Sequence, residues 1–146
     1  MTTTGQASSI PTSRKVLCVV YGAISLAALV ATWSQNVAYF DKPTRFLLDS
    51  KVTPASRSLT VDLLLFLLAA AILMVLEARR HGVKFVWLYI AGGFAIAISV
   101  TFPLFLIARE LRMGGSDVPR LRATDTMLLA VVAAVSAGST IWVDMG

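Results

Sequence analysis

Residues 59–76 read LTVDLLLFLLAAAILMVL, an apolar run whose only charged residue is Asp62. A helix of about 20 such residues crosses the roughly 30 Å hydrocarbon core of a bilayer. In lipid, every backbone polar group needs a partner within its own helix or within a closed barrel, and barrel strands alternate apolar and polar residues. This continuous run therefore predicts a transmembrane helix.

Three other stretches share this length and apolar character. Together they predict an all-α protein, an integral membrane bundle of four transmembrane helices that run mainly antiparallel because their connections are short. The expected helices cover residues 16–33, 59–77, 85–107 and 125–143. Residues 1–14 are polar and predict a disordered tail, which leaves residues 15–146 as a single transmembrane domain.

Composition limits the classes of function. The 146 residues are 57% hydrophobic and 14% charged, against about 25% charged in soluble domains. The net charge of +5 comes from basic residues that flank the expected helices, which favours contact with anionic headgroups over nucleic acid. With one cysteine, Cys18, and one histidine, His81, the chain offers no disulfide, zinc or bis-histidine haem site. We therefore expect no metal and no cofactor.

Several short motifs between residues 62 and 110 are similar to a known family. They are Asp62-Leu63-Leu64, the run from Glu77 to Gly82, Trp87-Leu88-Tyr89-Ile90, and Ser99 followed by Pro103-Leu104-Phe105-Leu106 and Arg109-Glu110. This pattern resembles an uncharacterised bacterial membrane family, the domain of unknown function 2834. The resemblance implies a small multi-helix membrane protein and no particular activity. Because family members are typically shorter, the helix at 125–143 looks like an extension.

Asp62 is the candidate catalytic residue. In an antiparallel bundle Asp62 would share one interfacial layer with Arg109, Glu110 and Asp125. An ionisable group in a membrane helix suggests a functional site, with Asp62 as general acid, base or cation ligand and Arg109 as counter-ion. The alternative is structural, because an acid in the first turn of a helix is stabilised by the helix dipole.

Arg79 and Arg80 form a second candidate site in the connector that follows the second helix. Their guanidinium groups suit a lipid phosphate or an acidic segment of a partner. With Arg109 and Glu110 they are the candidate ligand or lipid contacts. The structural alternative is a topology signal, in which Glu77 pairs with Arg80 or His81 at helical spacing.

Other residues predict how the helices pack. Pro103 removes one backbone hydrogen bond and predicts a bend, with a pocket opening beside Asp62. Gly93 predicts a close helix contact. A ridge of small residues predicts packing of the fourth helix inside the bundle or against a second subunit: Ala130, Ala134 and Gly138.

The long loop at residues 34–58 predicts a short interfacial helix opened by Pro43. Pro54 would separate that helix from the second transmembrane helix, which Ser58 would cap and Gly82 would end. The loop is either a lid over a cavity or a segment anchored by its apolar side chains.

Three classes of function remain open. The chain is a non-enzymatic accessory, assembly or lipid-interacting protein, a membrane enzyme that acts on a lipid or isoprenoid through Asp62, or an oligomeric carrier or channel. We expect the cell membrane as its location and the lipid bilayer as its partner, with a membrane-protein partner or a second copy possible and no nucleic acid. The two long loops carry eight basic residues against five at the N-terminus and the connector, a count that would place the long loops in the cytoplasm. The five are the denser group, because they crowd the connector at 77–84 and, as Arg14 and Lys15, flank the first helix, which favours both termini in the cytoplasm.

Overall fold

The computed structural model describes residues 10–114 and 122–145. The chain divides into two compact units, residues 1–115 and 116–146. The single domain expected over residues 15–146 stays a prediction. Residues 1–9 of the predicted tail lie outside the described residues. The elements of the first unit are α1 (Thr12–Asn36), a 3₁₀ turn η1 (Val37–Tyr39), α2 (Pro43–Asp49), α3 (Pro54–His81), α4 (Val86–Gly92), a π-helical turn η2 (Gly93–Ala97) and α5 (Ile98–Arg112); the second unit holds α6 (Ala123–Met145).

Four helical stretches are long and apolar enough to cross a membrane, which confirms the prediction of an all-α membrane protein. They are Thr12–Tyr39, Pro54–His81, Val86–Arg112 and Ala123–Met145. Most of their large apolar side chains are exposed in the protein itself. Lipid is the solvent that makes such a surface stable, because apolar side chains facing water would favour aggregation.

Helix α3 begins one turn earlier than expected. Thr53 is its N-cap, and not Ser58. The Thr53 hydroxyl accepts from the Ser56 backbone N–H at 3.0 Å, and the Ser56 hydroxyl accepts from the Thr53 N–H at 3.1 Å. Pro54 opens the helix at its first position, where no N–H is needed, and so does not separate it from the preceding loop. Gly82 ends the helix in the left-handed conformation, at φ 67°, as predicted.

The loop between α1 and α3 contains the short helix α2, and Pro43 opens it as expected. Tyr39 anchors this helix: its ring meets Phe46 edge-on at 5.5 Å, and its hydroxyl donates to Asp49 at 3.1 Å. Leu47 and Leu48 are each 62% exposed. These contacts favour the anchored segment, with two leucines free to enter the interface.

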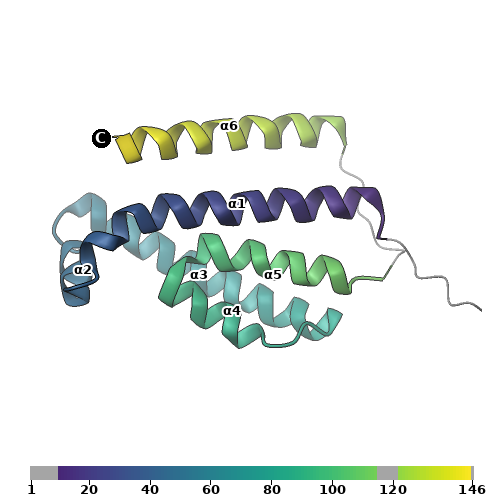
Figure 1. Ribbon diagram of the computed structural model, residues 1–146, viewed down its shortest axis with the longest axis horizontal. Helices are drawn as coiled ribbons and strands as arrows, with labels where there is room; N and C mark the ends of the chain where they lie inside the picture. Colours follow the sequence, from purple (N-terminus) through teal and green to yellow (C-terminus); the bar gives the residue numbers. More distant parts are fainter. Residues whose placement is uncertain (1–9, 115–121, 146) are drawn as a thin grey trace, which may run out of the picture. The chain divides into compact units, whose positions relative to one another are not determined.

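The third apolar stretch reverses direction at Ala97, as Figure 1 shows for α4 and α5. Ala97 is extended, at φ −179° and ψ 142°. The rings of Tyr89 and Phe105 lie 5.8 Å apart, whereas sixteen positions along a straight helix would separate them by about 24 Å. The two arms, residues 86–97 and 98–112, are about 18 and 22 Å long, shorter than the roughly 30 Å core. A helical hairpin with arms this short would enter a bilayer and return to the same side.

The change of direction therefore lies at Ala97, and not at Pro103 as expected. Helix α5 continues through Pro103, which is buried. Hydroxyl groups satisfy carbonyls near the reversal: Thr101 donates to Ala97 at 3.4 Å, and Ser25 of α1 donates to Val100 at 2.9 Å. In lipid this matters, because a backbone carbonyl without a partner costs several kcal/mol there.

The hairpin packs between α1 and α3. Helix α1 runs antiparallel to α5, since Arg14 contacts Met113 and Ser25 contacts Val100. The core lies between α3 and the hairpin, where the side chains of Met74 and Phe105 are fully buried. Gly93 is half-buried beside this core, and a Cβ there would come within 3.2 Å of side chains from α3 and α5.

Helix α6 is described by itself. It begins at Ala123, and Asp125 in its first turn accepts from the Arg122 backbone N–H at 3.0 Å. All its described residues are exposed within this unit, including Ala130, Ala134 and Gly138. The role of that ridge in packing stays a prediction.

Candidate functional site

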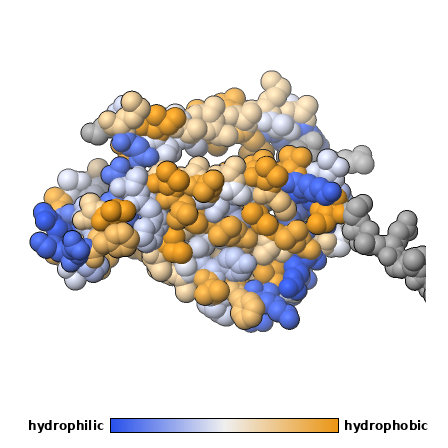
Figure 2. Space-filling view, in the orientation of Figure 1, coloured by the Kyte–Doolittle hydropathy of each residue, from blue (hydrophilic) through white to orange (hydrophobic). Residues whose placement is uncertain are grey.

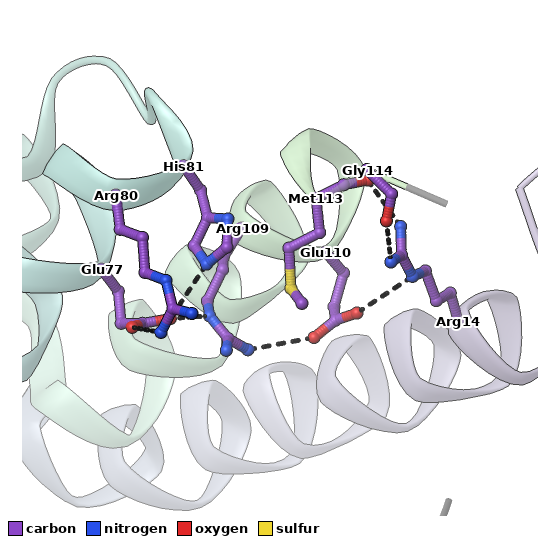
Figure 3. Close-up of polar contacts among 8 residues, drawn as sticks. All are labelled: Arg14, Glu77, Arg80, His81, Arg109, Glu110, Met113 and Gly114. Atoms are coloured by element: carbon purple, nitrogen blue, oxygen red, sulfur yellow. Dashed lines mark hydrogen bonds and ion pairs between the residues drawn. The ribbon is translucent and has the colours of Figure 1, made fainter. Parts of the chain in front are cut away.

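One end of the first unit gathers the charged residues of three helices. The N-terminal end of α1, the C-terminal end of α3 and the C-terminal end of α5 meet there, as the contacts in Figure 3 show. We call this group the charge cluster; its members are Arg14, Glu77, Arg80, His81, Arg109 and Glu110. The reversal at Ala97, which we call the fold-back, makes this meeting possible. It brings the C-terminal end of α5 back to the end of the first unit at which α3 finishes.

Glu77 lies in the last turns of α3 and accepts from Nε of Arg109. His81 Nε2 lies 3.4 Å from the same carboxylate, and Arg80 lies 4.0 Å from it. The pairing of Glu77 with Arg80 and His81 at helical spacing is therefore confirmed. Its partner on α5, 32 positions along the chain, was not predicted. The predicted layer of Asp62 with Arg109 and Glu110 is wrong, because the hairpin returns Arg109 to the Glu77 end.

Arg109 also connects Glu77 to a second carboxylate. One of its terminal nitrogens donates to Glu110 at 3.1 Å, and the other Glu110 oxygen lies 3.9 Å from Arg14 Nε. The Glu110 and Arg14 side chains are only 7% and 4% exposed. Cations and carboxylates thus alternate from α3 through α5 to α1, which compensates charges that would be costly to bury alone.

Arg14 also closes the end of α5. Its two terminal nitrogens donate to the carbonyls of Met113 and Gly114, at 2.6 and 2.5 Å. Both residues directly follow α5, and the C-terminal end of a helix carries partial negative charge, so a guanidinium is favourable there. Sequence reasoning treated Arg14 only as a topology signal. A single arginine beside an apolar run gives no indication of such a partner.

The ion pairs of the charge cluster hold the ends of α1, α3 and α5 together. Glu77 has Arg109 and His81 beside it, and Glu110 has Arg109 and Arg14. A catalytic acid or base needs access to a substrate, and these carboxylates are engaged and mostly buried. Among the described residues, no three His, Cys, Asp or Glu side chains are grouped as metal ligands would be.

The surface around the charge cluster is basic. Its two acids are enclosed, so the exposed charges of the described residues at this end are all positive: Lys15, Arg79, Arg80, Lys84 and Arg112. Figure 2 shows hydrophilic residues at the ends of the first unit and an apolar surface between them. Of the four predicted ligand contacts, Arg79 and Arg80 are exposed, although Arg80 lies 4.0 Å from Glu77, and Arg109 and Glu110 are engaged in ion pairs.

Asp62 lies away from this end. It is fifteen positions before Glu77 on α3, about 22 Å along the helix, and its side chain is exposed. Among the described residues it forms no hydrogen bond or ion pair.

An open groove lies where the charge cluster meets the connector from α3 to α4, and the pocket expected beside Asp62 stays a prediction. Its volume is about 450 Å³. It is lined by Ala78, Arg79, Gly82, Val83, Lys84, Phe85, Val86 and Trp87. Arg112 of α5 supports the connector by donating to the Gly82 carbonyl at 3.0 Å.

Helices with apolar flanks and charged residues gathered at their ends define an α-helical integral membrane protein. The chain belongs to the family described as protein of unknown function DUF2834, whose model matches residues 20–111. That match runs from α1 to the end of α5 and leaves α6 outside, as the resemblance implied. Comparisons with curated proteins and with solved structures gave no match.

Proposed function

We propose that this chain is a non-enzymatic membrane protein that interacts with anionic lipid through the basic end of its first unit. One observation carries the proposal. Both acids at this end, Glu77 and Glu110, are in ion pairs within the charge cluster, whereas five basic side chains beside the apolar helices are exposed. Each basic residue near an anionic membrane surface contributes about 1 kcal/mol of attraction. The basic end therefore has a ready partner in the headgroups of its own leaflet.

The same end supports a cytoplasmic orientation. The fold-back brings together seven basic residues: Arg14, Lys15, Arg79, Arg80, Lys84, Arg109 and Arg112. The opposite end of this unit has four: Lys42, Arg45, Lys51 and Arg57. Basic residues near the ends of membrane helices favour the cytoplasmic side. We assign the Arg14 end to the cytoplasmic face of the cell membrane.

Native mass spectrometry of the protein released from mild detergent tests the proposal. Micelles would contain equal amounts of phosphatidylglycerol, which is anionic, and phosphatidylcholine, which is zwitterionic. We expect the protein to retain mainly phosphatidylglycerol, with a preference that falls as salt is added because salt screens exposed charges. Equal retention of the two lipids would refute the proposal.

The alternative of acid–base catalysis at Asp62 gains no support from its surroundings, since the described groove lies at the far end of α3. The Asp62→Asn variant separates the two functions. We expect it to leave the lipid composition of the host membrane and the retention of phosphatidylglycerol unchanged. Accumulation of one lipid species in cells that carry this variant would favour the enzyme.

A further inference from the structure

The groove at the connector from α3 to α4 combines two cations with two exposed aromatic rings. Arg79 and Lys84 line it, and neither forms an ion pair within 4.0 Å among the described residues. By contrast, Arg80 is near Glu77, and Arg112 donates to the Gly82 carbonyl. The two basic side chains of the groove are therefore not engaged by acidic side chains among the described residues.

The two aromatic residues, Phe85 and Trp87, line the groove where the connector enters α4. Phe85 is the one described residue other than glycine with positive φ, at 60°. This conformation costs about 1–2 kcal/mol in a residue with a Cβ. Val83 and Val86 on either side are buried, at 9% and 5% exposure, and hold the turn in place. Phe85 is 76% exposed, and Trp87, two residues later in the first turn of α4, is 64% exposed.

The position of these groups identifies the class of ligand. Aromatic side chains with such exposure are typical of the headgroup level of a bilayer, where the ring meets both lipid and water. Guanidinium and ammonium groups bind phosphate oxygens through charge-assisted hydrogen bonds. A free anion would use the cations alone and gain nothing from Phe85 and Trp87. A phospholipid uses both, with its phosphate on the cations and its glycerol region against the rings.

The groove is open to its surroundings and its walls are tied to the rest of the first unit. Its volume is about 450 Å³. Its walls come from the end of α3, the connector and the start of α4, and the contact of Arg112 with Gly82 ties them to α5. Because Glu77 is neutralised by Arg109, the nearest acid does not repel a phosphate.

We infer that this groove is a specific binding site for one anionic phospholipid of the surrounding leaflet, held by Arg79 and Lys84 and by the rings of Phe85 and Trp87. The inference rests on the proposed function and narrows it, from attraction over the whole basic end to one site.

Two matched double variants test the site. R79A/K84A removes one arginine and one lysine from the groove, and K15A/R80A removes the same charges from the same end outside it. Circular dichroism confirms that each variant folds. In native mass spectrometry with phosphatidylglycerol, we expect R79A/K84A to weaken binding of the first lipid at least about tenfold more than K15A/R80A does.

The outcomes separate the site from the wider proposal. Equal losses in the two double variants would overturn the site and leave a diffuse attraction to the basic end. A wild-type protein without preference for phosphatidylglycerol would overturn both. Inorganic phosphate in excess provides the last arm: we expect the lipid to stay bound, whereas displacement by phosphate would show a site for free anions. Loss of binding in F85A/W87A, with both cations present, would further support a lipid.

Discussion

The charge cluster predicts that Glu77 and Glu110 are coupled through Arg109. In Glu77→Gln, Arg109 keeps Glu110 at 3.1 Å, so we expect a loss of roughly 1–2 kcal/mol in the free energy of unfolding. In Glu110→Gln, Arg14, 4% exposed, loses its carboxylate and keeps only backbone carbonyls, so we expect roughly 2–4 kcal/mol. The double variant leaves Arg109 without either acid, and its loss should exceed the sum of the single losses by about 1 kcal/mol.

Reversible unfolding in mixed micelles, followed by circular dichroism, measures these values. Arg80→Gln is the control, because its side chain is 72% exposed and lies 4.0 Å from Glu77; such surface pairs contribute about 0–1 kcal/mol. Strictly additive losses, or a Glu77→Gln variant as stable as the wild type, would show that Arg109 does not connect the two carboxylates.

Three more predictions concern packing and turns, each measured by the same unfolding assay. Gly93→Ala should destabilise the protein by about 1–3 kcal/mol, because its Cβ would meet side chains at 3.2 Å. Gly22→Ala, whose Cβ would have its nearest contact at 4.0 Å, should leave the stability unchanged or raise it by up to about 1 kcal/mol. Equal effects of the two substitutions would contradict the fold-back. Gly82→Ala should cost about 1–2 kcal/mol because φ is 67°, and an unchanged stability would refute the left-handed turn. Ser25→Ala should lower the stability by about 0.5–1.5 kcal/mol, because it removes the hydrogen bond to the Val100 carbonyl. An unchanged stability would show that Ser25 of α1 does not lie against Val100 of α5.

Much of the helical structure follows from the sequence for clear physical reasons. An apolar run of transmembrane length must be helical, which accounts for all four long stretches. Gly82 was predicted as the end of α3 and Pro43 as the start of α2, because a left-handed residue and a missing N–H each suit one kind of helix terminus.

The reversal at Ala97 was missed, because hydropathy counts residues and carries no information on direction. The segment Gly92 to Ser99 is apolar or small throughout, and alanine is a good helix former. Adjacent glycines at 92 and 93 were the available signal: both allow α5 to approach, since a Cβ at Gly92 would lie 3.0 Å from Thr101. They indicated close packing, but not that the packing partner was the next part of the same stretch.

The candidate site was predicted in part for the same reason. Glu77, Arg80 and His81 are neighbours on one helix, so their spacing alone predicts contact. Arg109 was assigned to the wrong end because an unbroken third span would have carried it there. The partners of Arg14 depend on the same reversal. One undetected turn thus displaced every long-range contact of the charge cluster.

Accessibility of single cysteines tests the fold-back most directly. In a Cys18→Ser background, cysteines would replace Lys84, Arg112 or Lys51, all of them exposed. Sealed vesicles of known orientation would be treated with a maleimide that does not cross membranes. The hairpin predicts that positions 84 and 112 react from the same side, the cytoplasmic one, and position 51 from the other. Reaction of 84 and 112 from opposite sides would show that residues 86–112 cross the bilayer as one straight helix.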